Sequence, residues 1–150
     1  MKCIQCPKVY TEKEKSIFLA GGITGCADWQ SKFIELLKEE NIVILNPRRE
    51  KYAENFPDIE KEQITWEFNH LKLADAVIFW FPKDTLCPIT LYELGKVSVF
   101  NKPIFIGVDP EYLRKSDVEI QTNLIRPEVQ IVYSLEELSS QVKKWINSKN

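Results

Sequence analysis

The feature that most constrains the fold of this 150-residue chain is an unbroken apolar run, Ala76 to Phe81, which Pro82 ends. A strand with one face in water alternates apolar and polar side chains, and this run has no polar position. We therefore expect a strand that is buried on both faces. Such strands are typical of the centre of a parallel sheet that helices cover on both sides.

The rest of the chain alternates short apolar segments with helical patterns, as a parallel α/β sheet requires. Helices are expected to begin near Asp28, Ile59, Pro88 and Ser134, with a short one inside 109–126. Right-handed crossovers then predict a doubly wound sheet in the order 2-1-3-4-5, with helices on both faces. The five expected strands span 16–20, 42–45, 76–81, 103–107 and 129–133. Residues 1–15 are polar and rich in lysine, so we expect an N-terminal arm before one domain over 16–150.

Composition excludes several classes of protein. The net charge is −2, from 20 basic and 22 acidic residues, and no long basic run is present, so no nucleic-acid partner is expected. A small nucleotide remains compatible with this charge. The longest apolar stretch is far too short to span a membrane, and the first residues lack the apolar core of a signal peptide. The expected location is the cytoplasm.

The cysteines raise the question of a metal site. Cys3 and Cys6 form a CxxC pair, which is half of a zinc site. The chain has no second CxxC, and His70 is its only histidine. Four ligands are needed for a structural zinc ion, so we expect no metal and no cofactor.

Ligands of doubly wound sheets bind beyond the carboxyl ends of the strands, where the strand order reverses. Three expected loops meet there: Gly21 to Gly25, Asn46 to Arg49, and the segment from Pro82 toward Glu93. The glycine loop lacks the dinucleotide-binding spacing. It is either a tight turn with positive φ or a backbone that a ligand approaches closely. The guanidinium groups of Arg48 and Arg49 either bind a phosphate or carboxylate, or pair with Glu50 or Glu54 on the surface.

Two carboxylates are candidates for catalysis. Glu93 is expected about one and a half turns into its helix, where the helix dipole favours the anion and hence a nucleophile. Glu67 follows Trp66, whose ring is expected to shield the carboxyl from water, raise its pKa and suit it to be a general acid. The alternative for each is an exposed helical glutamate.

These residues together resemble the nucleoside 2-deoxyribosyltransferase-like family over roughly residues 16–108. The resemblance rests on segments 17–23, 28–29, 46–49, 63–67, 74–82 and 90–95. It implies a flavodoxin-like fold, cleavage of an N-glycosidic bond with Glu93 as the nucleophile, and Glu67 near the base. It also implies a small nucleoside or nucleotide as partner, and self-association into a homo-oligomer. Expected substrate-binding residues are Gly21, Gly22, Ile23, Asp28, Trp29, Asn46, Arg48, Arg49, Gln63, Trp66 and Thr90.

One position departs from the resembled enzymes. They carry an aspartate six residues before the nucleophile, which holds the sugar hydroxyls, and here that position is Cys87. A second hypothesis therefore stands beside the enzyme: a module of the same fold that binds a nucleotide or an ADP-ribose-like ligand without catalysis.

Overall fold

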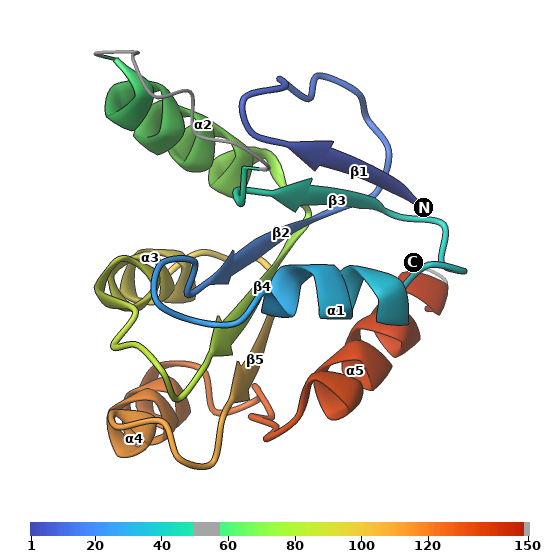
Figure 1. Ribbon diagram of the computed structural model, residues 1–150. Helices are drawn as coiled ribbons and strands as arrows, with labels where there is room; N and C mark the ends of the chain where they lie inside the picture. Colours follow the sequence, from blue (N-terminus) through green and yellow to red (C-terminus); the bar gives the residue numbers. More distant parts are fainter. Residues whose placement is uncertain (50–57, 149–150) are drawn as a thin grey trace.

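The computed structural model describes residues 1–49 and 58–148, which form one five-stranded parallel sheet with helices on both faces (Figure 1). The strand order is β1-β3-β2-β4-β5, and every neighbouring pair is parallel. The strands are β1 (Lys2–Gln5), β2 (Ser16–Gly21), β3 (Val43–Asn46), β4 (Ala76–Phe81) and β5 (Ile104–Val108). The helices are α1 (Trp29–Leu36), α2 (Ile59–Leu73), α3 (Pro88–Ser98), α4 (Lys115–Ile125) and α5 (Leu135–Asn147).

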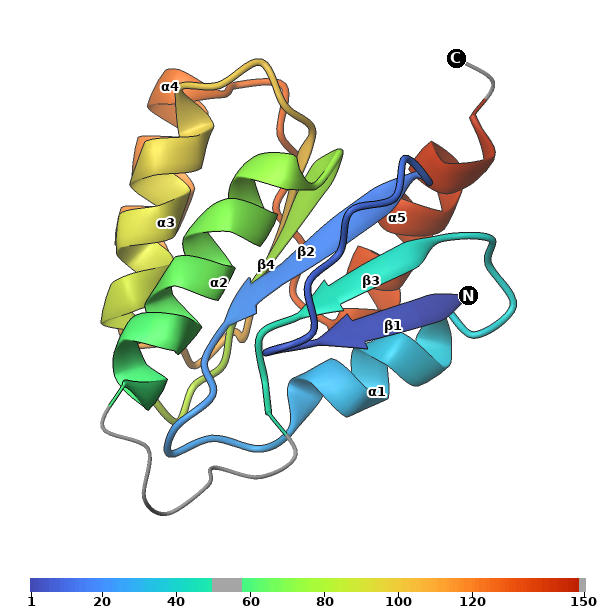
Figure 2. The same ribbon diagram turned by 90° about the horizontal axis from the view of Figure 1, so that it is seen from above.

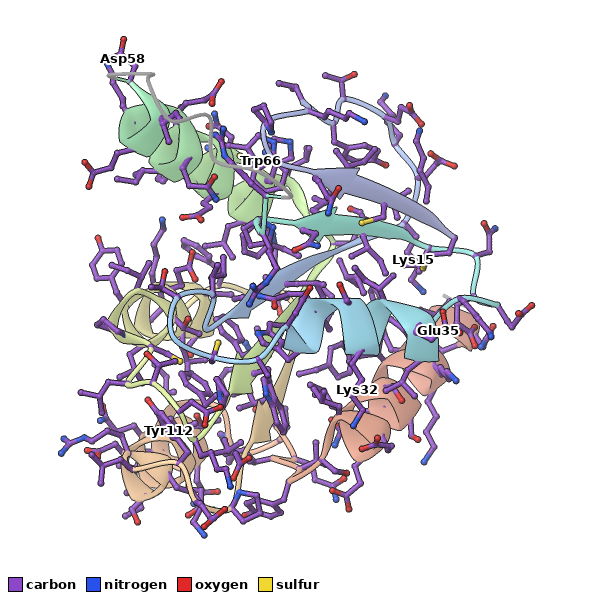
Figure 3. All side chains as sticks on the ribbon, viewed as in Figure 1. Lys15, Lys32, Glu35, Asp58, Trp66 and Tyr112 are labelled. Carbon is purple, nitrogen blue, oxygen red and sulfur yellow. The ribbon has the colours of Figure 1, made fainter. Side chains whose placement is uncertain are left out.

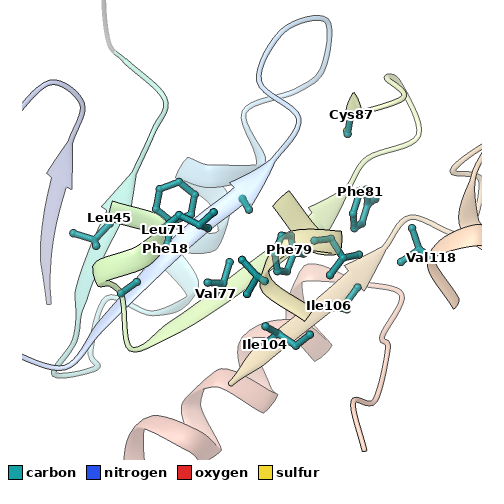
Figure 4. Close-up of a cluster of buried hydrophobic side chains, with 14 of the residues drawn as sticks. Phe18, Leu45, Leu71, Val77, Phe79, Phe81, Cys87, Ile104, Ile106 and Val118 are labelled. Atoms are coloured by element: carbon teal, nitrogen blue, oxygen red, sulfur yellow. The ribbon is translucent and has the colours of Figure 1, made fainter. Parts of the chain in front are cut away.

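Two helical layers enclose the sheet. Helices α2, α3 and α4 cover one face, and α1 and α5 cover the other (Figure 2). The side chains of β4 alternate between the two layers, with Val77 and Phe79 toward the first and Ile78 and Trp80 toward the second. Figure 4 shows the first cluster, where Phe79 packs among residues of β2, β5 and α4. The double burial expected of 76–81 is confirmed, since all six residues of β4 are buried.

The centre of the sheet has the expected order. Strand β2 pairs with β3 on one side and with β4 on the other, and β4 pairs with β5. The carboxyl ends of β2 and β4 therefore lie side by side, with Gly21 opposite Trp80. The reversal of strand order expected at this point is confirmed.

The two edges of the sheet differ from expectation. Within the segment expected as an N-terminal arm, residues 2–5 form β1 and extend the sheet beside β3. At the other edge, the strand expected over 129–133 is reduced to a single parallel bridge between Val132 and Gly107. The Val108 amide donates to the Val132 carbonyl, and the Val132 amide donates to the Ile106 carbonyl. The ladder stops there because the chain turns at Ser134 into α5.

The helix starts follow the expected capping residues. Asp28 accepts a hydrogen bond from the Ser31 amide at the start of α1, and Ser134 accepts one from the Glu137 amide at the start of α5. Pro88 is the first residue of α3. None of the described helices is long and apolar enough to cross a membrane.

Candidate active site

A cavity of about 320 Å³ lies at the carboxyl ends of β2 and β4. Its floor is the end of β2, and its walls are the glycine loop, one side of α2 and the first turns of α3. Seven of the thirteen site residues expected from sequence line it. They are Gly21, Gly22, Ile23, Gln63, Glu67, Thr90 and Glu93.

Glu93 lies in the second turn of α3 and is half-buried in this cavity. Burial raises the pKa of its carboxyl to about 8, the negative charge of Glu67 adds to the rise, and Lys96 opposes it. The expectation that the helix dipole would favour the anion is wrong for the free protein, because loss of solvent outweighs it. Near neutral pH this carboxyl therefore keeps its proton.

Glu67 faces the same cavity from α2. Burial raises the pKa of its carboxyl, while a hydrogen bond from Gln63 and the positive charge of Arg49 lower it. The expected direction is confirmed, with burial as its largest cause, and the Trp66 ring is not among the residues that line the cavity. The ring of Trp66 packs against Phe18 and His70, and its indole N–H donates to the Lys8 carbonyl at 2.7 Å. Figure 3 shows Trp66 between α2 and the N-terminal segment.

Two consecutive arginines each bind a glutamine beside the cavity. Arg49 Nε donates to Gln63 Oε1 at 2.6 Å, and its terminal nitrogen pairs with Glu62. Arg48 Nε donates to Gln30 Oε1 at 2.9 Å, and the same nitrogen lies 3.2 Å from an Asp28 carboxylate oxygen. Both guanidinium groups are thus held by other parts of the protein. The expected alternative partners, Glu50 and Glu54, lie outside the described residues.

The glycine loop is held against α1 by its own backbone. The Gly22 carbonyl accepts from the indole of Trp29 at 2.9 Å and from Gln30 Nε2 at 3.2 Å. A Cβ atom added at Gly21 would lie 2.4 Å from the Trp29 ring and 2.7 Å from the Trp80 carbonyl oxygen. Close packing therefore requires a glycine there. Positive φ, one of the two alternatives considered for the loop, occurs only at Gly25 among its described glycines.

The start of α3 completes the cavity wall. Cys87 precedes the helix with φ of 48°, in the left-handed region that non-glycine residues rarely adopt. Its buried thiol donates to the Thr85 carbonyl, and burial raises the pKa of that thiol to about 12. The thiol is therefore neutral and takes no part in charge balance. Thr90 is almost fully buried and lines the cavity from the first turn.

With this geometry in place, comparison with known proteins gives one family. The family model described as "Nucleoside 2-deoxyribosyltransferase like" matches residues 14–112, which include every strand but β1 and the whole cavity wall. This chain belongs to the nucleoside 2-deoxyribosyltransferase-like family. Membership supports a role in glycosyl transfer on nucleosides in general. No significant match is found among curated proteins.

One solved structure extends the likeness of this deoxyribosyltransferase-like chain to its fold. It is described as a conserved protein from Enterococcus faecalis V583 and is 16% identical in sequence. The alignment covers 89% of this chain and 99% of the other, with a TM-score of 0.62. At this identity the likeness establishes the architecture alone.

The other six expected site residues of this deoxyribosyltransferase-like chain lie behind the cavity wall. Trp29, Asp28 and Arg48 hold the glycine loop or the start of α1. Asn46 is buried and accepts from the Arg48 amide, in a local turn of the chain. Arg49 holds Gln63, and Trp66 faces the N-terminal segment.

Several lining residues were missed by sequence reasoning. Phe18 and Ala20 project from β2 into the layer of α2 and α3, and their alternation along the strand was the signal for them. Thr85, Pro88 and Ile89 line the cavity from the segment between β4 and α3, where no periodic pattern marks side-chain direction. Within residues 1–49 and 58–148, no group of three or more His, Cys, Asp or Glu residues is placed to hold a metal ion.

Proposed function

We propose that this cavity cleaves the N-glycosidic bond of a (deoxy)nucleoside or nucleotide, with Glu93 as the nucleophile and Glu67 as the general acid. One observation carries the proposal. Two glutamates from adjacent helices line a single cavity, and burial there raises the pKa of each carboxyl. Perturbed carboxyl pairs in a cleft are a frequent mark of acid–base catalysis. The family supports a nucleoside as the small-molecule ligand.

The chemistry needs one proton in the carboxyl pair. A Glu93 carboxylate oxygen bonds to the anomeric carbon as the bond from that carbon to the base nitrogen breaks. The electron pair of the broken bond stays on the base, which takes the proton of Glu67. Water or a second base then attacks the anomeric carbon, releases Glu93 and returns a proton to Glu67. Water gives hydrolysis, and a second base gives transfer.

The proton of the carboxyl pair must move from Glu93 to Glu67 before attack. Burial holds it on Glu93, whereas the reaction needs Glu93 ionised and Glu67 protonated. Positive charge that develops on the sugar favours the Glu93 anion, so the substrate itself supports this redistribution. The total charge of the pair does not change.

The test uses chromatography to measure the release of free base from a panel of deoxynucleosides and their monophosphates. Each substrate is tried with and without an acceptor base. Glu93→Gln keeps the size of the side chain and removes the nucleophile, so turnover falls at least about 10³-fold. The exposed Glu60→Gln on α2 is the matched control and keeps wild-type turnover. Wild-type turnover in Glu93→Gln contradicts the mechanism.

A specific observation favours a second candidate, a ligand-binding module without catalysis. The resembled enzymes use an aspartate where this chain has Cys87, and the buried neutral thiol does not replace a carboxylate. A nucleotide or ADP-ribose-like ligand that raises the melting temperature without any base release supports this candidate. Base release by the wild type rules it out.

A further inference from the structure

We propose that Arg49 and Gln63 are positioning residues, which leave Oε2 of Glu67 as the oxygen that holds and delivers the proton to the departing base. The inference rests on the proposed function. The inference goes beyond that function because it assigns the proton to one atom and gives two residues a role other than contact with the substrate.

The first step is the orientation of the Gln63 amide. Its Oε1 accepts from Arg49 Nε at 2.6 Å, and its Nε2 donates to the Pro47 carbonyl at 2.8 Å. A flipped amide would place N–H against N–H at Arg49 and two carbonyl oxygens together at Pro47. Only one orientation therefore satisfies both neighbours.

The second step fixes the carboxyl of Glu67. The same Gln63 Nε2 donates to Glu67 Oε1 at 2.8 Å, one helical turn along α2. A carboxyl oxygen that accepts this N–H is a poor place for the proton, so the protonated group carries it on Oε2. Since Glu67 lines the cavity, the donor it presents to a ligand is Oε2–H.

The third step is the fixed position of the Arg49 guanidinium group. Its side chain is only 7% exposed, and its terminal nitrogen pairs with Glu62 at 2.6 Å. The guanidinium is planar and is held at two of its nitrogens, so it cannot rotate toward the cavity without losing both contacts. Arg49 therefore acts on the reaction through Gln63 and Glu67.

The charged and titratable groups around Glu67 come from three elements. Arg49 belongs to the segment after β3, Glu93 belongs to α3, and the thiol of Cys6 follows β1. The Gln63 hydrogen bond lowers the pKa of Glu67 against the rise that burial causes. Loss of that bond raises the pKa of Glu67 further.

The main variant is Gln63→Met, which keeps the length of the side chain and removes its hydrogen bonds. We expect kcat to fall about 10- to 100-fold, because the acid loses its fixed orientation, while KM stays within about 2-fold. The acidic limb of the pH profile moves to higher pH. The control is Gln141→Met on α5, whose amide donates to the Gln130 carbonyl far from the cavity, and it keeps wild-type kinetics.

A second variant, Arg49→Lys, keeps the positive charge and loses the planar Nε donor. We expect kcat to fall in this variant too. Because the two side chains act as one unit, the loss of kcat in the double variant is expected to be smaller than the product of the two single losses. If Gln63→Met does not fold, as a thermal melt would show, Arg49→Lys decides the question.

An independent measurement separates this inference from the proposed function. Carbon-13 NMR of the glutamate carboxyls in the ligand-free protein is expected to show a higher pKa for Glu67 in Gln63→Met and in Arg49→Lys, and no change in Gln141→Met. Wild-type titration of Glu67 in both site variants overturns the inference. So does a raised KM with unchanged kcat and pH profile, which would mean direct contact with the substrate. Absence of any base release with a shifted Glu67 titration refutes the proposed function and leaves the positioning network in place.

Discussion

At the scale of residues, the cavity brings two carboxyl groups close enough for the charge of Glu67 to raise the pKa of Glu93. Such a pair loses its protons in two steps that belong to both groups together. Burial raises the pKa of both, and the Gln63 hydrogen bond and Arg49 make Glu67 the easier of the two to ionise. The singly protonated pair is therefore the dominant form over a range that ends near pH 8.

This range predicts a bell-shaped dependence of base release on pH. Above about pH 8 the pair loses its last proton and the departing base has no acid, so the rate falls. At low pH both carboxyls are protonated and no nucleophile remains, so the rate falls again. Initial rates at saturating nucleoside from pH 4 to 10 test this. A rate that keeps rising beyond pH 9 would show that no proton from the pair is needed.

Sequence reasoning found Glu93 because strand order places the loop before it at one end of the sheet, and it found Glu67 through its neighbour Trp66 and the family resemblance. It misplaced Trp66, although that residue is next to Glu67 in the chain. Successive residues on a helix point about 100° apart, so Glu67 faces the cavity while Trp66 faces Lys8. The side-chain directions of Arg48 and Arg49 follow from partners on α1 and α2, which no local pattern contains.

At the scale of elements, the end of β2 is packed too closely for any side chain at position 21. Gly21→Ala is expected to lower the free energy of unfolding by about 1–3 kcal/mol, because the new methyl group meets the Trp29 ring and the Trp80 backbone. Chemical denaturation measures the change.

Gly95→Ala is the matched control. Apart from the backbone of α3 and the two chain neighbours, no atom of residues 1–49 and 58–148 lies within 4 Å of a Cβ at this position, so the same substitution is expected to raise the free energy of unfolding by about 0.5–1 kcal/mol. Equal effects of the two substitutions would contradict the packing argument.

His70 joins α2 to the N-terminal segment in its neutral form. Its Nε2 accepts from the Tyr10 amide at 3.0 Å, and its Nδ1 lies 2.7 Å from the Trp66 carbonyl oxygen, where it acts as the donor. Protonation of Nε2 would remove the acceptor. Burial accordingly lowers the pKa of His70 below its ordinary 6.5, although the hydrogen bond to Trp66 opposes this.

Because the pKa of His70 is lowered by folding, its contribution to stability is complete above about pH 6.5 and is lost as the pH falls toward the folded pKa. We expect the difference in unfolding free energy between the wild type and His70→Gln to shrink from pH 7.5 to pH 5. Taking the difference cancels the opposite contribution of Glu93, whose raised pKa costs stability as the pH rises from 4.5 to about 8. A difference that does not change with pH would contradict the neutral form.

At the scale of the whole molecule, the central strands and the starts of α1, α3 and α5 could be predicted, because burial patterns, capping residues and a proline at the first helical position are local signals. The two edges of the sheet could not be predicted in this way. Strand β1 is four residues long and polar, and it pairs only with β3, so its sequence resembles a tail. The segment 129–133 has a strong strand pattern, but only Val132 reaches β5.

The outer surfaces of α2, α3 and α4 expose large apolar side chains, which is unusual for a monomer in water. We predict, as the family resemblance also implies, that the protein self-associates. Light scattering after size exclusion is expected to give a multiple of the monomer mass, and Tyr92→Glu on α3 is expected to lower it. A monomer at all concentrations would contradict this prediction. The side chains include Ile64, Phe68, Ile89, Tyr92 and Leu124.

On helix α2, Trp66 and His70 bind the first ten residues of the chain, whereas Gln63 and Glu67 line the cavity. Anything that loosens the beginning of the polypeptide will therefore also disturb the acid, because the two pairs of side chains lie on neighbouring faces of one helix. An affinity tag fused ahead of Met1, or a protease cut near Tyr10, belongs among the variables that a biochemist should control before judging whether the protein is active.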